Sequence, residues 1–349
     1  MDLFQLGHVP WVDSQLCYHA LAQLGREGLI IVSPKNHYVC VGYHQDARLE
    51  VDLDYCKSHD IPVFRRQVGG GAVYLDGNQL FFQIVLHRNS PLAPLNKETF
   101  YRKFLRPVIE VYRRIGIPAQ FKAINDIVTD GKKISGTGAG EIADCIVFVG
   151  NLILDFDYKT MSRVLNVPDE KFRDKVHRSM EANLTTIRRE LGLKRAEKWT
   201  HSELNRLMIE EFCKVLGPLT HVDEDNELAT KMNDLGKLMN TESWLYRRGR
   251  VPNGRQMKIR SGVNLIHRVH KAQGGLIRAD FEIMEGKYTE VCFSGDWFCY
   301  PQDAISVLES KITGVFQGEL GLVIEKFYDD YEIDTPGITI DDWIAVLKV

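Results

Sequence analysis

The most informative stretch of this chain is Arg65-Arg66-Gln67-Val68-Gly69-Gly70-Gly71-Ala72-Val73-Tyr74. Three consecutive glycines follow residues 63–66, whose composition predicts a short strand. Because glycine has no Cβ, the backbone of such a loop can approach a ligand closely and point its N–H groups at it. The two arginines add positive charge, so we interpret the loop as a cradle for a carboxylate or a phosphate. A flexible surface turn is the alternative for a lone glycine triplet.

A second glycine-rich stretch follows Asn125-Asp126-Ile127-Val128 and reads Gly-Lys-Lys-Ile-Ser-Gly-Thr-Gly-Ala-Gly over residues 131–140. A lysine between glycines at the edge of a β-hairpin can place its ammonium against a carboxylate and a phosphate at once, as an adenylating site requires. Asp126 is a few residues upstream and could hold a magnesium ion or fix the lysine. Taken alone, the same hairpin is also typical of a solvated turn.

Hydrophobic periodicity and turn residues predict an alternation of strands and helices along the chain. The predicted strands cover residues 29–33, 38–43, 63–66, 80–87, 124–128, 133–135, 145–156, 275–284 and 288–293. The predicted helices cover residues 97–115, most of 159–217 and 302–312. Thr200 and Glu203 predict a capping box at the start of a helix that Gly217 ends. The polar, acidic stretch 222–242 is a candidate linker or bridging helix before a last block that begins near Trp244.

The two glycine-rich segments, in this order and at this separation, resemble the lipoate-protein ligase family, within the superfamily shared with biotin ligases and octanoyltransferases. In that family an RRxxGGGAVxHD loop binds lipoyl-adenylate, and an NDI/LV strand leads to a GxKIxGSA hairpin with an essential lysine. Further matches lie at residues 41–45 (VGYHQ), 150–154 (GNLIL), 274–277 (GGLI), 285–288 (EGKY) and 294–298 (SGDWF). The last three resemble an accessory domain that lets a ligase perform the adenylation itself.

The resemblance implies an α+β fold. A large catalytic domain of mixed and antiparallel sheets flanked by helices is expected over residues 1–243, and a small α+β accessory domain over residues 244–349. The implied activity activates lipoate with ATP and Mg²⁺ as lipoyl-AMP and transfers the lipoyl group to a lysine of a carrier protein. Lys133 is implied as the catalytic lysine, and Asn125 and Asp126 are implied on the ATP side, with Asp126 as a candidate Mg²⁺ ligand. The implied lipoyl- and adenylate-binding residues are Arg66, Gly70, Gly71, Ala72, Val73, Tyr74, Asn78, Gln79, Ser135, Gly136 and Asn151.

The chain departs from the family pattern at several positions near the expected ligand. Leu75 replaces the histidine before Asp76, and Phe148-Val149 replaces the paired histidines before Gly150. Asn151 replaces a small polar residue, and Gly138 stands where alanine is common. These departures predict a lipoyl tunnel or a lysine-presenting face that is shaped for an unusual carrier.

Composition excludes several classes of partner and compartment. The formal net charge of −3 gives no global attraction to nucleic acid or to an anionic membrane. No stretch approaches the roughly 20 apolar residues of a membrane helix, and no secretory signal is evident. Seven cysteines without a CxxC pair fit a reducing compartment, so a cytoplasmic location is expected. A monomer is the expected oligomeric state. Neither a P-loop nor a GxGxxG motif is present, which removes the usual basis for P-loop or Rossmann chemistry.

The expected partner is a lipoyl carrier protein: an E2 lipoyl domain, a glycine-cleavage H protein or a specialised lipoate-binding protein. A basic patch, defined as the cationic residues between Trp244 and Ala279, is either a solvated face or a dock for an acidic carrier or for ATP phosphates. Its members are Arg247, Arg248, Arg250, Arg255, Lys258, Arg260, Arg268, Lys271 and Arg278.

Three competing functions stay open at this point. A cysteine-dependent octanoyl or lipoyl transferase would need no ATP, but it would need a reactive thiolate. Residues 117–124 contain no cysteine where such relatives carry it, and Cys145 in an apolar strand is more typical of a core residue. A non-catalytic protein that binds lipoyl carriers is the second competing function. A biotin ligase is the third, and the RRQVGGGAV loop argues against it.

Overall fold

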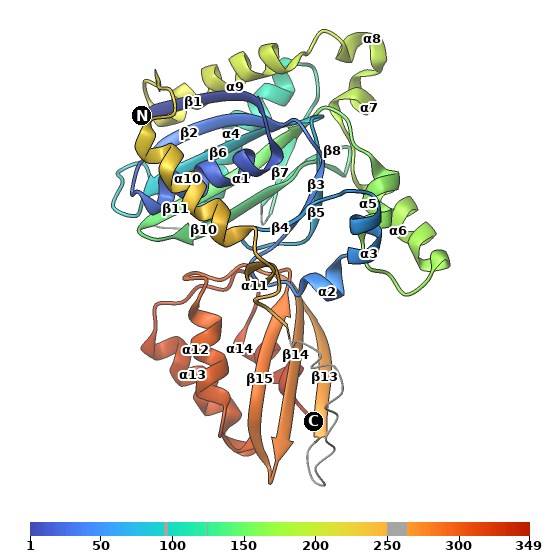
Figure 1. Ribbon diagram of the computed structural model, residues 1–349, viewed down its shortest axis with the longest axis vertical. Coiled ribbons are helices and arrows are strands. Elements are labelled where there is room, and N and C mark those ends of the chain that lie inside the picture. The colour runs from blue at the N-terminus through green and yellow to red at the C-terminus, as the bar shows by residue number, and fades with distance from the viewer. Residues whose placement is uncertain (94–96, 124, 250–263) are drawn as a thin grey trace. The chain divides into compact units, whose positions relative to one another are not determined.

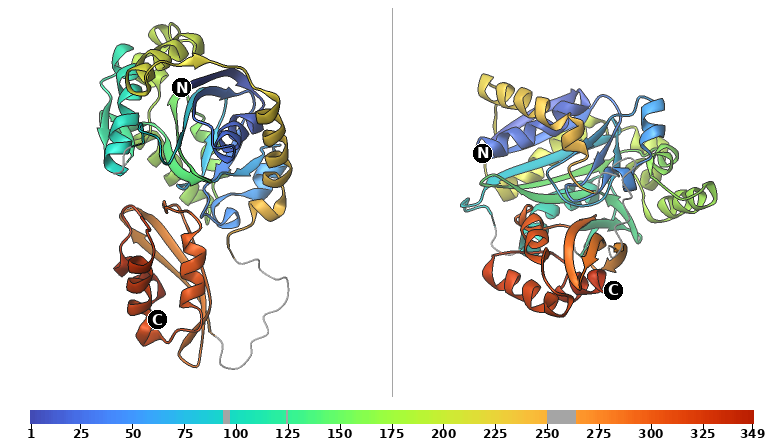
Figure 2. Two further views of the ribbon diagram at one scale, coloured as in Figure 1. Left: turned by 90° about the vertical axis from the view of Figure 1, so that its left-hand side faces the viewer. Right: turned by 60° about the horizontal axis from the view of Figure 1, so that its bottom comes forward.

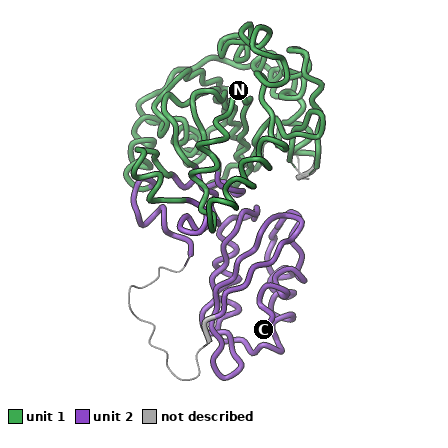
Figure 3. Tube along the Cα trace, turned by 90° about the vertical axis from the view of Figure 1, so that its right-hand side faces the viewer, with its two compact units in different colours: residues 1–39, 52–63, 73–238 green, residues 40–51, 64–72, 239–349 purple. Residues whose placement is uncertain are grey.

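The computed structural model describes residues 1–93, 97–123, 125–249 and 264–349. The chain forms two compact units (Figure 3). The first unit contains residues 1–39, 52–63 and 73–238, and the second contains residues 40–51, 64–72 and 239–349. The second unit thus combines the last part of the chain with two earlier segments, and the segment 64–72 contains the three consecutive glycines. In the described part of the chain, no helix is both long and apolar enough to cross a lipid bilayer.

The first unit is built on a six-stranded mixed sheet in the order β10-β11-β6-β2-β1-β12 (Figure 1). Strand β1 runs parallel to β2 and β12, and the other neighbours are antiparallel. The strands are β1 (Asp2–Val9), β2 (Gly28–Pro34), β6 (Gln79–His87), β10 (Thr137–Ile142), β11 (Cys145–Ile153) and β12 (Thr220–His221). Every residue of β2 is buried, as expected for a central strand that is covered on both faces.

Helices cover both faces of this sheet. Successive residues of a strand point to opposite faces of the sheet. The contacts of Phe82 and Gln83, which are adjacent in β6, therefore show which helix packs on each face. The Gln83 amide donates a hydrogen bond to the Ser14 carbonyl of α1 (Trp11–Gln23) over 2.7 Å. The Phe82 ring lies 5.4 Å from the ring of Phe212 in α9 (His201–Leu216), which packs against α4 (Lys97–Arg114). Figure 2 (left) shows α1 on one side of the sheet and α4 and α9 on the other.

Two small sheets carry the segments that the sequence singles out. Strands β7 (Gln120–Lys122), β8 (Asp126–Thr129) and β9 (Lys132–Ser135) are antiparallel neighbours in the order β7-β8-β9. Strands β3 (Tyr38–Val41), β4 (Val63–Arg65) and β5 (Val73–Leu75) form a sheet in the order β4-β3-β5. The remaining helices before residue 250 are α2 (Ala47–Glu50), α3 (Leu53–Ser58), α5 (Tyr158–Val164), α6 (Glu170–Asn183), α7 (Ile187–Leu191), α8 (Leu193–Ala196), α10 (Asn226–Met239) and α11 (Glu242–Leu245).

The C-terminal part of the second unit is an antiparallel sheet with helices on it. Strands β13 (Asn264–Ala272), β14 (Gly275–Met284) and β15 (Lys287–Gly295) pair in that order. Helices α12 (Ala304–Ile312), α13 (Leu320–Asp330) and α14 (Ile340–Leu347) and a short 3₁₀ turn at Gln317–Glu319 follow. The core is aromatic, because the fully buried Trp343 ring lies 4.9 Å from Phe293 and 5.4 Å from Trp297.

A capping box begins α14. The Thr339 hydroxyl accepts the N–H of Asp342, and the Asp342 carboxylate accepts the N–H of Thr339 over 2.8 Å. The second carboxylate oxygen lies 2.7 Å from Nε2 of His270. Partial burial acts to raise the pKa of Asp342, but the bonds from Thr339 and His270 outweigh burial and hold this pKa below the usual 3.8.

The predicted α+β class is confirmed, and most predicted elements are present with shifted ends. The predicted strand 38–43 ends at Val41, the strand 145–156 ends at Ile153, and the helix 302–312 begins at Ala304. The predicted helical stretch 159–217 is five separate helices, and the candidate linker 222–242 contains α10. Ile124, the predicted start of the strand 124–128, lies outside the described residues, and β8 begins at Asp126.

Candidate functional site

Lys133 lies on β9 and is paired with Asp126 on the adjacent strand β8. Its Nζ is 2.6 Å from Oδ1 of Asp126, and the Lys133 side chain is 39% exposed. The strands meet in a tight turn at Asp130 and Gly131, which both have positive φ. Of the two roles predicted for Asp126, the contact that fixes the lysine is therefore present. The ammonium is oriented by a carboxylate and is still accessible to a ligand from solvent.

The backbone around Lys133 is fixed from outside the hairpin. The Lys133 carbonyl accepts the N–H of Thr185 over 2.8 Å. The next carbonyl, that of Ile134, accepts the hydroxyl of Tyr112 over 2.7 Å. Tyr112 lies in α4 and is fully buried, which raises the pKa of its phenol and keeps the hydroxyl a donor. The lysine is thus presented by an anchored strand.

Five of the predicted ligand-binding residues form one hydrogen-bonded group in the first unit. Asn151 accepts the Gly136 N–H over 2.8 Å and donates to the Gln79 side chain over 2.8 Å. Gln79 in turn donates to the Tyr74 carbonyl over 3.3 Å, and the Ser135 hydroxyl donates to the Asn151 carbonyl over 2.6 Å. Sequence reasoning selected these residues, but it did not predict that they bond to one another.

Asn125 is bonded to the strand that follows the lysine hairpin. Its amide donates to the carbonyl and to the hydroxyl oxygen of Thr137 over 3.2 Å each. The Thr137 hydroxyl donates back to the Asn125 carbonyl over 2.5 Å. The side-chain nitrogen and the backbone carbonyl of Asn125 are therefore bonded to Thr137, a residue that sequence reasoning did not single out.

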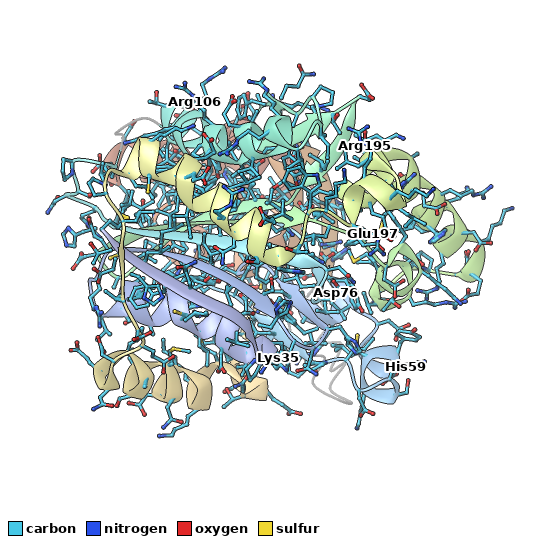
Figure 4. The ribbon with its side chains drawn as sticks, turned by 90° about the horizontal axis from the view of Figure 1, so that it is seen from above. Lys35, His59, Asp76, Arg106, Arg195 and Glu197 are labelled. Carbon is cyan, nitrogen blue, oxygen red and sulfur yellow. The ribbon has the colours of Figure 1, made fainter. Side chains whose placement is uncertain are left out.

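Asp76 and Asn78 form a turn directly before β6, and Asp76 is labelled in Figure 4. The Asp76 carboxylate accepts the backbone N–H of Asn78 over 2.9 Å and faces its side-chain amide at 3.4 Å. Burial is the largest influence on the pKa of Asp76 and raises it above the usual value. Leu75 and Val149, at the positions of the family histidines, are both half-buried.

In the second unit, Arg66 holds the glycine-rich loop in its shape. Its guanidinium donates to the carbonyls of Gly69 over 2.7 Å, Gly71 over 2.9 Å and Cys40 over 3.1 Å. The planar guanidinium reaches these carbonyls from two nitrogens, a geometry that the compact ammonium of lysine does not reproduce. The guanidinium of Arg66 therefore stabilises the conformation of the glycine-rich loop.

Arg65 has a different environment from its neighbour. It is completely buried and donates to the carbonyls of Gly42, Tyr43 and Leu245 over 2.6–3.0 Å. Burial is the main cause that lowers the pKa of this guanidinium to about 9. The expectation that both arginines bring charge to a ligand is wrong for Arg65, whose charge is used inside the fold.

Glycine is required both in the loop and at Gly42 beside it, because other atoms of the second unit lie close to these positions. A Cβ on Gly42 would stand 1.9 Å from the Gly70 carbonyl oxygen, and a Cβ on Gly69 would stand 2.8 Å from the Phe298 ring. Gly70 has a φ of +90° and donates its N–H to the Trp297 carbonyl over 3.4 Å. One of the amides expected to face a ligand is therefore bonded within the second unit. Sequence reasoning missed the part played by Phe298 here.

The described members of the basic patch are mostly engaged with other side chains. Arg248 is buried and pairs with Glu309 at 3.1 Å, and Arg278 pairs with Glu50. Arg247 is exposed, but its guanidinium lies 4.5 Å over the Trp244 ring. Arg268 and Lys271 are also exposed, and the remaining four members, Arg250, Arg255, Lys258 and Arg260, lie outside the described residues. A continuous docking face is thus not supported by the described part of the patch.

The described residues do not favour a nucleophilic Cys145 or a metal site built from several side chains. Cys145 is buried, and burial is the main cause that raises the pKa of its thiol to about 11, so it is not a thiolate at neutral pH. Within the described ranges, no group of three or more His, Cys, Asp or Glu side chains could hold a metal ion. A magnesium ion at Asp126 would take its other ligands from phosphates and water, as Mg²⁺ commonly does.

A family model and individual relatives of known function indicate the same protein family. A family model described as the lipoyl protein ligase A/B catalytic domain matches residues 11–213. A lipoate-protein ligase of Streptococcus pyogenes is 27% identical over 278 residues, which is 78% of this chain and 76% of the relative. Lipoate-protein ligase 1 of Staphylococcus aureus is 26% identical over 266 residues, which is 74% of this chain and 73% of the relative.

Solved structures agree with these relatives in fold. A structure of a bi-partite lipoate protein ligase and its E2 lipoyl domain from Thermoplasma acidophilum has a TM-score of 0.62 and 25% identity, and it covers 72% of this chain and 98% of that one. P. falciparum LipL1 in complex with lipoate has a TM-score of 0.72 at 17% identity and covers 99% and 98% of the two chains. A lipoate-protein ligase A bound with ATP has a TM-score of 0.59 at 23% identity, with 70% and 98% covered.

Proposed function

The chain belongs to the lipoyl protein ligase A/B catalytic-domain family, and from this membership we propose that it is an ATP-dependent lipoate-protein ligase. In the first step the lipoate carboxylate attacks the α-phosphate of ATP, which forms lipoyl-AMP and releases pyrophosphate. In the second step the lysine amine of a carrier attacks the acyl carbon, which forms an amide and releases AMP. The ATP-bound and lipoate-bound structural neighbours support this choice of substrates.

The observation that carries the proposal is the Lys133–Asp126 pair on its anchored hairpin. Negative charge grows on the phosphoryl oxygens in the first step and on the acyl oxygen in the second. An ammonium that is already oriented for that charge needs no reorganisation during the reaction, which is the main source of electrostatic catalysis. We assign Lys133 this role and assign Asp126 to its orientation.

Magnesium and the nucleotide are proposed on the Asp126 side. Asp126 is a partly exposed carboxylate, and Mg²⁺ usually binds one or two carboxylates together with substrate phosphates, so the residue fits this ion. A bound Mg²⁺ would offset the charge of the ATP phosphates. Asn125 precedes this carboxylate and is assigned to the same side of the site.

The lipoyl and phosphate groups are proposed to lie along the glycine-rich loop. Arg66 shapes this loop through the carbonyls of Gly69 and Gly71. The proposed contacts come from Gly70, Gly71, Ala72, Val73, Tyr74 and Asn78, together with Ser135 and Gly136 beside the lysine.

The proposed macromolecular partner is an E2 lipoyl domain, a choice that the Thermoplasma ligase with its E2 lipoyl domain supports. An H protein or a specialised lipoate-binding protein would present the same kind of lysine. The cytoplasmic location, the monomeric state and the division into a catalytic domain over 1–243 and an accessory domain over 244–349 stay predictions from the sequence.

Incubation of the purified protein with ATP, Mg²⁺, lipoate and a purified E2 lipoyl domain tests the proposal. We expect pyrophosphate release and a gain of one lipoyl group in the intact mass of the carrier. Transfer of an octanoyl group from acyl carrier protein without ATP would replace the proposal by a cysteine-dependent octanoyl or lipoyl transferase. Absence of a mass gain on both E2 and H-protein carriers, with tight carrier binding, would replace it by a non-catalytic binding protein.

A further inference from the structure

A single residue, Gly136, separates the lysine hairpin from the main sheet. Strand β9, which carries Lys133, belongs to the small β7-β8-β9 sheet and ends at Ser135. Strand β10 begins at Thr137 and belongs to the six-stranded sheet. The direction in which the hairpin leaves the main sheet is therefore set at this junction.

Asn151, on strand β11, holds both polar backbone groups of the junction residue. Its backbone N–H donates to the Gly136 carbonyl over 3.2 Å, and its side-chain oxygen accepts the Gly136 N–H over 2.8 Å. The backbones also approach closely here, because a Cβ on Gly150 would stand 3.0 Å from the Gly136 oxygen. A residue without a side-chain acceptor at position 151 would leave the Gly136 N–H without this partner.

Gln79, on strand β6, fixes which way the Asn151 amide faces. The Asn151 nitrogen donates to the Gln79 side-chain oxygen, while the Gln79 nitrogen donates to the Tyr74 carbonyl. A flip of the Asn151 amide would place its nitrogen against the Gly136 N–H, so the pair locks one orientation. Both side chains are buried, with Gln79 1% and Asn151 7% exposed.

We propose that Asn151 and Gln79 are positioning residues that hold the lysine hairpin against the main sheet, and that they do not bind the ligand. The resemblance alone implied ligand-binding roles for both, but their amide groups are already committed to the junction and to each other. The Asn125–Thr137 contacts fix the other side of the same junction. The catalytic part of this inference rests on the proposed function, because it acts through Lys133.

Steady-state kinetics of lipoyl-AMP formation tests the catalytic consequence. Asn151→Leu and Gln79→Leu should each lower kcat by about 10- to 100-fold, since a displacement of about 1 Å in a positioned group has effects of this size. The KM values for lipoate and ATP should stay within about threefold, and the double variant should be no worse than the less active single variant. The swap Asn151→Gln with Gln79→Asn keeps an amide pair and should recover part of the lost kcat.

Gln83→Leu is the matched control. Gln83 lies on the same strand and the same face as Gln79, is 2% exposed and also donates to a backbone carbonyl, that of Ser14. It has no bond to the junction in the described structure. We expect this variant to lose stability without losing kcat, at a temperature where every variant is folded by circular dichroism.

Hydrogen exchange gives a readout that does not depend on activity. In the Asn151→Leu variant, amide exchange in the peptide 132–140 should become faster than in the wild type, and in Gln83→Leu it should not. Unchanged exchange, additive kinetic effects, or a KM that rises about tenfold at constant kcat would each overturn the inference. If the wild type forms no lipoyl-AMP, the proposed function fails, and the exchange experiment still decides whether the two amides hold the hairpin.

Discussion

Replacement of Lys133 by methionine separates the catalytic role of this lysine from any structural one. Methionine keeps the length and most of the apolar stem but removes the ammonium. Among the residues that the structure describes, Lys133 pairs with Asp126 at 2.6 Å, and 39% of its side chain and 30% of that of Asp126 are exposed. The backbone anchors from Thr185 and Tyr112 do not involve the side chain and should persist in the variant.

These contacts allow the activity and stability effects to be estimated separately. An ion pair between partly exposed side chains contributes about 0.2–1 kcal/mol to folding. Loss of one preorganised donor to developing negative charge costs about 10²- to 10³-fold in rate, or roughly 2.7–4 kcal/mol. Lys133→Met should therefore lose far more transition-state stabilisation than folding free energy.

The assay measures pyrophosphate release with lipoate and ATP, together with urea unfolding of the same preparations. Lys132→Met is the matched control, because Lys132 is adjacent on β9 and points to the opposite face of the strand. We expect Lys132→Met to stay within about threefold of the wild-type kcat. Near-normal pyrophosphate release by Lys133→Met, or an equal loss in both variants, would refute the role assigned to the ammonium.

Three further substitutions test the surroundings of the site and the C-terminal fold. Gly42→Ala should lower the unfolding free energy by about 1–3 kcal/mol in a urea titration, because its Cβ would stand 1.9 Å from the Gly70 oxygen. Gly318→Ala is the control and should leave the unfolding free energy unchanged, because there is open space around Gly318. Arg66→Lys should raise the KM for lipoate or ATP about tenfold, ~1.4 kcal/mol of binding, because the compact ammonium of lysine does not reproduce the planar fork that binds the carbonyls of Gly69, Gly71 and Cys40; an unchanged KM would show that the loop keeps its shape without this fork. Asp342→Asn should lower the unfolding free energy by about 0.3–1 kcal/mol at pH 7, because it removes a negative charge from the N-terminus of α14. A carboxyl group whose pKa is lowered in the folded state stabilises the fold fully above its unfolded pKa of 3.8, and this contribution is lost as the pH falls through the lower folded pKa. The difference in unfolding free energy between the wild type and Asp342→Asn should therefore close below about pH 3.8. A constant difference from about pH 7 to 3 would contradict this prediction.

Local sequence chemistry predicted the elements whose signal is contained in a few neighbouring residues. Thr200 caps α9 and Gly217 ends it, as their residue types indicate. The alternating pattern of 275–284 predicted β14 with the correct bounds. Helix α1 was missed because every residue from Ser14 to Ala22 is buried, so this segment has no polar face and no helical period.

The sequence by itself determined the family, the α+β class and the two segments that carry the chemistry, since a glycine triplet beside arginines and a lysine in a glycine-flanked hairpin are local features. Only the tertiary structure decided what neighbouring residues of the same type do. Arg65 is buried against three carbonyls while Arg66 shapes the loop, and Asn151 meets Gln79 across 72 positions of sequence. Such partners are set by strand register and sheet order, which bring distant residues together and leave no trace in the spacing of residues along the chain.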